Sequence, residues 1–180
     1  MIRVKYNSFQ ICLLIVLVFS MFSCQKITTA LTSYFVSNAD SVNLSLPAPE
    51  GNISNFDQSL TSDQVHDLDS LILDFENNSK YRINFVSVTS IKPYQTIQEY
   101  SKALFNYWKL GAKNHGNDML IVYSDKMKEI SIISGKGIQK KFSEKEKNRI
   151  IQKYIHPAFE KGNFYDGVQL GLKKIIKKLL

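Results

Sequence analysis

The residues best suited to chemistry in this chain lie in or just after one stretch, residues 111–137, GAKNHGNDMLIVYSDKMKEISIISGKG. Its first loop carries His115, Asn117 and Asp118, and Glu144 follows at the first turn of a predicted helix. A helix start exposes free backbone N–H groups and the positive end of the helix dipole. Side-chain oxygens and free N–H groups near one another would form a polar site for a small ligand.

Each of these residues also has an ordinary alternative role. Asp118 would accept hydrogen bonds from its own turn, and Glu144 would stabilise the helix dipole by ~0.3–1 kcal/mol. His115 would be a solvated loop side chain. Gly135 and Gly137 would supply positive φ in a turn. The sequence also contains no G-x-S-x-G, H-E-x-x-H, C-x-x-C or Walker loop, so no familiar catalytic set is complete.

A predicted β-hairpin must position these residues. The run at 119–123, MLIVY, is short, apolar and typical of a strand buried on both faces. The run at 129–133 alternates only in part, which indicates a strand nearer the sheet edge. Because a hairpin returns the chain to its starting edge, the loop before Asp118 and the Gly135–Gly137 turn are expected to lie side by side.

The rest of the pattern predicts an α/β domain of three layers, a small mixed sheet with helices on both faces. Capping boxes mark helix starts at Thr61, Thr96 and Ser143, and a last helix runs from about residue 165 to the end. The second helix links a strand at 81–89 to the strand at 119–123, which predicts a parallel pair. Its buried face includes Tyr107 and Trp108, and His156-Pro157 is expected to end the third helix.

The first residues are typical of an export signal. Arg3 and Lys5 precede a short apolar run, and the sequence MFSC at 21–24 resembles a lipoprotein cleavage site. We expect residues 1–23 to be removed and Cys24 to carry lipid. The alternative is an uncleaved signal anchor with Cys24 as a structural residue.

Residues 24–52 are rich in Thr, Ser and Asn and are interpreted as a flexible tether, with a short strand at 31–36 as the alternative. The folded domain is expected to span 53–180. The chain of 180 residues has a net charge of +7. Such a charge favours acidic partners, but a lipid-anchored domain outside the cytoplasm would have no nucleic acid to bind.

Several segments in order resemble the TPM domain family. The matching segments are residues 55–61, 100–111, 116–124, 135–138 and 150–167. Residues 100–111, for example, read YSKALFNYWKLG. This resemblance implies a sheet covered by helices and an exported or membrane-tethered protein. It implies either a calcium- or magnesium-binding domain or an acid phosphatase.

The acidic positions of the family pattern are altered in this chain. The opening Asp falls on Asn55, the D-N-G triplet on Gly116-Asn117-Asp118, the Glu after the Gly turn on Gln139, and the helix-opening Asp on Glu144. A hard cation needs six to eight oxygens, several of them charged. We therefore expect weak binding of Ca²⁺ or Mg²⁺ by the ligand set Asn117, Asp118, Gln139 and Glu144.

The sequence thus favours an envelope lipoprotein whose TPM domain is a binding or assembly module for another envelope protein, in a bacterial cell envelope. A metal-dependent acid phosphatase is the alternative. A structural protein that contacts phosphate-rich glycolipid is a third hypothesis.

Overall fold

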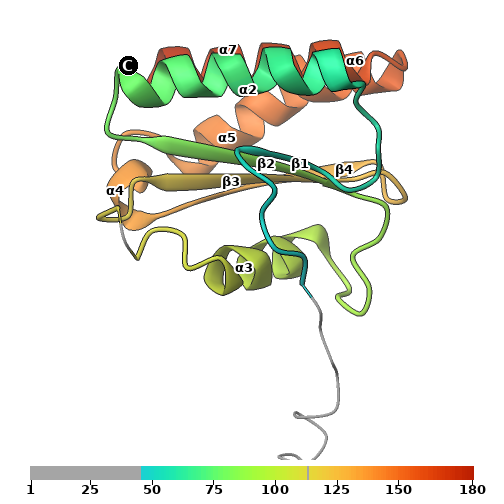
Figure 1. Cartoon of the computed structure of the whole chain (residues 1–180), viewed down its shortest axis with the longest axis horizontal. Helices are drawn as coiled ribbons and strands as arrows, with labels where there is room; N and C mark the ends of the chain where they lie inside the picture. The colour runs from blue at the N-terminus through green and yellow to red at the C-terminus, as the bar shows by residue number, and fades with distance from the viewer. Residues whose placement is uncertain (1–45, 113) are drawn as a thin grey trace, which may run out of the picture. The chain divides into compact units, whose positions relative to one another are not determined.

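The computed structural model describes residues 46–112 and 114–180. The predicted signal peptide, Cys24, the alternative strand at 31–36 and most of the predicted tether lie outside these residues. Within the described residues the chain forms three layers, and Figure 1 shows the sheet lying between helix α3 and the other long helices. The predicted α/β class with helices on both faces is confirmed.

A four-stranded sheet with the order β1-β2-β3-β4 forms the middle layer. Its strands are β1 (Ile53–Asn55), β2 (Arg82–Val88), β3 (Asp118–Ser124) and β4 (Glu129–Ser134). The first three strands are parallel, and β4 pairs antiparallel with β3. The predicted crossover and hairpin are confirmed, and every residue of β3 is buried. Strand β1 was not predicted.

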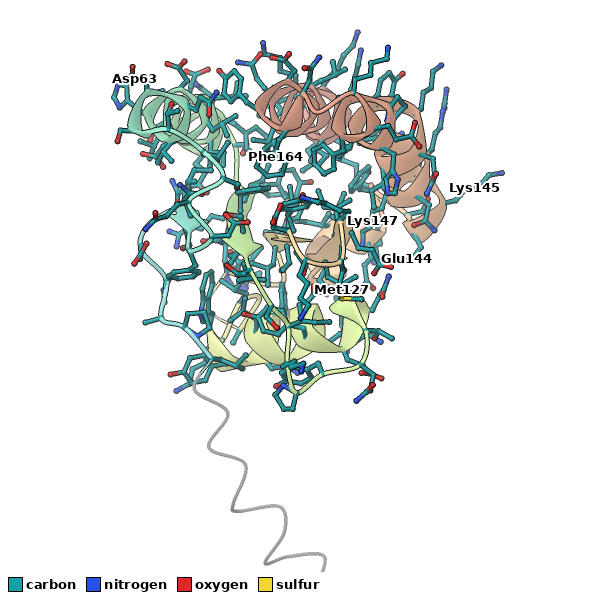
Figure 2. The ribbon with its side chains drawn as sticks, turned by 90° about the vertical axis from the view of Figure 1, so that its right-hand side faces the viewer. Asp63, Met127, Glu144, Lys145, Lys147 and Phe164 are labelled. Carbon is teal, nitrogen blue, oxygen red and sulfur yellow. The ribbon has the colours of Figure 1, made fainter. Side chains whose placement is uncertain are left out.

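Helices α2 and α5–α7 cover one face of the sheet (Figure 1). The elements on this side are α2 (Ser62–Asn77), α5 (Glu144–Ile150), a π-helical turn (Ile151–Ile155), α6 (His156–Glu160) and α7 (Phe164–Leu179). Fully buried side chains such as Phe85, Ile72 and Ile175 fill the core between these helices and the sheet. Figure 2 shows Phe164 pointing into this layer, whereas Asp63 lies at its outer surface.

Helix α3 (Ile97–Tyr107) covers the opposite face, over Val86, Leu120 and Val122. The prediction that Tyr107 belongs to its buried side was wrong, because Tyr107 is 56% exposed. Trp108 is half buried, and its indole N–H donates a hydrogen bond to the carbonyl oxygen of Pro47 at 2.7 Å. The chain before β1 therefore packs against the end of α3.

All three predicted capping boxes are present, and they start α2, α3 and α5. The expected helix end at His156-Pro157 was wrong. The helix widens into the π-helical turn and continues as α6, in which Pro157 lies at one of the first two positions. No helix among residues 46–112 and 114–180 combines the length and apolar character required to cross a membrane.

Candidate functional site

The loop before β3 and the turn after β4 meet, as the hairpin topology predicts. The N–H of Gly137 donates to the carbonyl oxygen of Gly116 at 3.0 Å, and the N–H of Gly135 donates to that of Asp118 at 2.9 Å. A Cβ on Gly135 would lie 2.4 Å from the Gly116 oxygen. We call this contact the loop junction, formed by residues 115–118 and 135–139.

The predicted role of the two glycines at this junction was wrong. Neither Gly135 nor Gly137 has positive φ, and residues 136–139 form a short helix, α4 (Lys136–Gln139), in place of a simple turn. Positive φ occurs instead at Gly111 and Gly116 in the facing loop. Glycine is required at 135 and 137 because the two backbones approach too closely for a side chain.

Asp118 uses both carboxylate oxygens within its own loop. One oxygen accepts a short hydrogen bond from the N–H of Gly111, and the other accepts from the amide of Asn114 at 3.2 Å. Asp118 is only 4% exposed. The carboxylate therefore closes the loop between α3 and β3, in the way expected of a turn-forming Asp.

Asn117 and Gln139 lie on opposite sides of the loop junction. Asn117 is buried, and its side-chain oxygen would lie 2.4 Å from a Cβ on Gly137. The Gln139 amide donates to the carbonyl oxygen of Ser134 at 3.1 Å. Both amides thus lie close to the junction backbone, together with Asp118.

Glu144 lies in a different environment, where it pairs with Lys147 at 2.5 Å. The Glu144 side chain is 73% exposed, whereas that of Lys147 is 2% exposed. Figure 2 shows this pair side by side, with Lys145 pointing away into solvent. Within the described residues, no hydrogen bond joins Glu144 to the loop junction, and no three His, Cys, Asp or Glu side chains gather as a metal centre would require. The four-residue ligand set stays a prediction.

Asn55, which stands at an acidic position of the family pattern, lies at the other end of the strands. It pairs in register with Ser87, near the end of β2, whereas Asp118 pairs with Arg82 at the start of β2. At ~3.3 Å per residue these two positions are about 16 Å apart along the strand. The Asn55 side chain closes the loop after β1 through the N–H and carbonyl oxygen of Leu60.

Glu144 and Lys147 line a groove of about 780 Å³ along the edge strand β4, which we call the β4 groove. Helix α3 contributes one wall through Gln98 and Lys102, and α5 with the π-helical turn contributes the other through Lys147 and Gln152. Strand β4 itself lies between the two walls. Sequence reasoning missed this site, although the i, i+3 spacing of Glu144 and Lys147 permits their ion pair.

The β4 backbone presents unpaired groups to this groove. In an antiparallel pair, opposite residues alternate between hydrogen-bonded and non-hydrogen-bonded positions. The hydrogen bond from Gly135 to Asp118 marks one hydrogen-bonded position of the pair. Counting back along β4 in steps of two, Ile133, Ser131 and Glu129 also lie at hydrogen-bonded positions and bond to β3. The N–H and C=O groups of Ile130 and Ile132 therefore point away from β3, toward the open edge.

The fold and this groove define a small three-layer α/β domain whose edge strand β4 lies along a groove. Residues 53–178 match the profile of the TPM domain, so the chain belongs to the TPM domain family. The family resemblance inferred from the sequence is confirmed. A search of curated proteins finds no match to this chain.

Solved bacterial structures share the fold. The N-terminal domain of a Porphyromonas (P. gingivalis) protein is 18% identical, with a TM-score of 0.66 over 71% of this chain and 81% of that one. The BA42 protein of Bizionia argentinensis is 24% identical, with a TM-score of 0.58 over 67% and 81% of the two chains. The N-terminal domain of a Corynebacterium glutamicum protein is 10% identical, with a TM-score of 0.57 over 77% and 86%. At these identities the likeness supports the fold alone.

Proposed function

We propose that this TPM domain is a binding or assembly module, held at the bacterial envelope by lipid on Cys24, and that the β4 groove is its contact surface. The observation that carries the proposal is the outward-facing backbone of Ile130 and Ile132 at the floor of a walled groove. Unpaired strand edges are templates for association, and proteins usually cover or charge them. Here the edge carries apolar residues and lies in a groove wide enough for a ligand.

The groove favours binding over catalysis. Its charged side chains, including Lys102, Glu129 and the Glu144–Lys147 pair, come from different walls and the strand end. A long groove with a backbone floor offers area and hydrogen bonds to a partner.

Site-specific photo-crosslinking tests the proposal in the bacterium that encodes the protein. A photoreactive residue at Gln98 or Gln152, one on each wall, is expected to capture the same envelope protein. The matched control is Leu73, which is 44% exposed on α2 and outside the groove. Filling the groove by Gln98→Trp should abolish capture from Gln152, whereas Leu73→Trp should not. Equal capture from Leu73 and Gln152, or no capture from either wall, would contradict the proposal.

Weak binding of Ca²⁺ or Mg²⁺ is a second part of the proposal, and the contacts of Asp118 sharpen its test. A cation at Asp118 would bind a carboxylate that already accepts from the Gly111 N–H and the Asn114 amide, and it would therefore alter both contacts. Calcium titration followed by NMR is therefore expected to shift Gly111 together with the ligand set, Asn117, Asp118, Gln139 and Glu144. Unchanged spectra at millimolar calcium would remove the cation from the proposal.

Metal-dependent acid phosphatase activity is the alternative that the family resemblance implied. Such activity would require a metal to activate water and neutralise phosphate charge. Hydrolysis of a phosphate ester should then be lost in Asp118→Ala and on addition of a chelator. Full activity in that variant would exclude this mechanism.

A further inference from the structure

We propose that the β4 groove receives an extended peptide segment, which pairs with β4 as a fifth strand and places an acidic side chain on Lys147 in exchange for Glu144. This inference rests on the proposed function and names the class of partner. The backbone of Ile130 and Ile132 offers both N–H groups and both C=O groups to such a segment. Addition of a strand to an open edge is a common mode of peptide recognition.

The length of β4 sets the length of the segment. Strand β4 has six residues, Glu129–Ser134, so a segment of about five or six residues, roughly 17–20 Å long, would pair along it. At one end the edge is already occupied, because the carbonyl oxygen of Ser134 accepts from Gln139. Pairing is therefore centred on Ile130 and Ile132, where the outward groups have no other partner among the described residues.

The walls of the groove select a single extended chain over a second copy of this protein. Helix α3 borders β4 on one face, and α5 with the π-helical turn borders it on the other. Two copies pairing through β4 would bring both pairs of walls to one edge. A lone segment brings no helices of its own and needs room for one strand only, at the ~4.8 Å spacing of a sheet.

Lys147 supplies the charge preference. Its side chain is 2% exposed and has Glu144 as its partner, although an ammonium group has three donors. A buried charge is costly without a counter-charge, so Lys147 must keep a carboxylate. Glu144 is 73% exposed and can turn into solvent. An acidic side chain of the incoming segment can then replace it with no change in the charge around Lys147.

Lys102 on the opposite wall adds a second positive charge, and Glu129 lies at the hairpin end of β4. With Glu144 displaced, the middle of the groove is positive and the hairpin end is negative. This distribution favours an acidic residue near the centre of the segment, flanked by β-branched residues.

The test uses the full-length protein in detergent micelles and synthetic seven-residue peptides that alternate Thr and Val. One peptide has a central Glu, the second a central Gln, and the third has the Glu with methyl groups on all of its backbone nitrogens. The Glu peptide is expected to shift the amide signals of Ile130 and Ile132 and to bind about tenfold more tightly than the Gln peptide. The methylated peptide should not bind.

Two variants assign the preference to the ion pair. Lys147→Met should remove the difference in affinity between the Glu and Gln peptides. Glu144→Gln should raise the affinity for the Glu peptide, because it removes the carboxylate that competes for Lys147. Equal affinity of the two peptides for the unaltered protein, or binding of the methylated peptide, would overturn the inference. A dimer in light scattering that Gln98→Trp dissociates would also overturn it, in favour of a second copy.

The two proposals fail separately. If no peptide shifts Ile130 or Ile132 while in-cell crosslinks from both groove walls persist, the peptide inference is wrong and the binding module stands. If the crosslinks themselves are absent, the proposed function is wrong.

Discussion

Replacement of Gly135 by Ala is the sharpest test of the loop junction. Gly135 has φ −68° and ψ 164°, a conformation that any residue adopts. On backbone grounds alone, Gly135→Ala should stabilise the protein by about 0.4–1 kcal/mol. The added Cβ, however, would lie 2.4 Å from the oxygen, 2.8 Å from the carbonyl carbon and 2.9 Å from the Cα of Gly116. These are backbone atoms, which cannot rotate away.

The cost follows from the contacts that must separate. Restoring a normal contact requires a shift of about 1 Å, which would disrupt the bonds from Gly135 to Asp118 and from Gly137 to Gly116. Each backbone hydrogen bond contributes about 1 kcal/mol, and overpacking typically costs about 1–3 kcal/mol. After the favourable backbone effect is subtracted, we expect a loss of about 2–4.5 kcal/mol in unfolding free energy.

Urea and thermal unfolding measure this change. For a folded part of this size, a loss of about 2–4.5 kcal/mol lowers Tm by about 8–18 °C and the urea midpoint by about 1–2 M. Gly162→Ala is the matched control, because Gly162 has φ +77° but nothing within 4 Å of a Cβ. Its cost is backbone strain alone, about 1 kcal/mol. If Gly135→Ala unfolds at or above the Tm of the wild type, the close approach of the two loops is refuted.

Three further predictions concern single groups. Burial raises the pKa of Glu76 above its ordinary value of 4.5. The contribution of this carboxyl group to stability is therefore complete below pH 4.5 and is lost as pH rises through the raised pKa. Glu76→Gln should reduce this dependence of the unfolding free energy on pH in urea titrations, and an unchanged dependence would contradict the prediction. Burial also raises the pKa of Tyr100 to about 12, so stability should fall from about pH 10 upward; Tyr100→Phe should remove this loss, whereas Tyr107→Phe, at an exposed position, should not. Cys24→Ser should abolish labelling by radioactive palmitate and release the protein from membranes; retention in the membrane fraction would argue for the uncleaved anchor.

The central features of the fold could be predicted because each follows from a local sequence pattern that fits one type of element. The run at 119–123 is apolar throughout, and only a strand with covered faces buries every residue. The capping boxes at Thr61, Thr96 and Ser143 satisfy backbone donors that each helix leaves free. A hairpin and a crossover then leave little choice of topology.

The features that were missed depend on tertiary contacts. Strand β1 has three residues, Ile-Ser-Asn, which is too short for any periodicity. Tyr107 continues the α3 pattern at helical spacing, but the helix ends there and the ring is exposed to solvent. Pro157 removes one backbone donor, which normally ends a helix. In this chain the preceding π-helical turn changes the bonding register, so the helix continues.

The candidate site was predicted in part. Hairpin topology correctly placed the loop before β3 against the turn after β4, because both ends of a hairpin lie at one edge. The same topology does not specify where a helix that follows will place its first side chain. Glu144 therefore joins Lys147 in the β4 groove. The burial of Lys147 could not be read from the sequence either, since a lysine in the pattern EKEKNR is typical of a solvated face.

The altered acidic positions explain why we propose the groove, and not the strand ends, as the contact surface. The side-chain oxygens of Asn55 and Asp118 accept hydrogen bonds that close the loops after β1 and before β3. Such bonds stabilise the fold but leave little capacity for a ligand. The β4 edge is the reverse case, because the backbone groups of Ile130 and Ile132 contribute nothing to the sheet on their outer side. Free backbone groups lose less when a partner binds than groups that must first break an internal hydrogen bond, and this difference favours binding at β4.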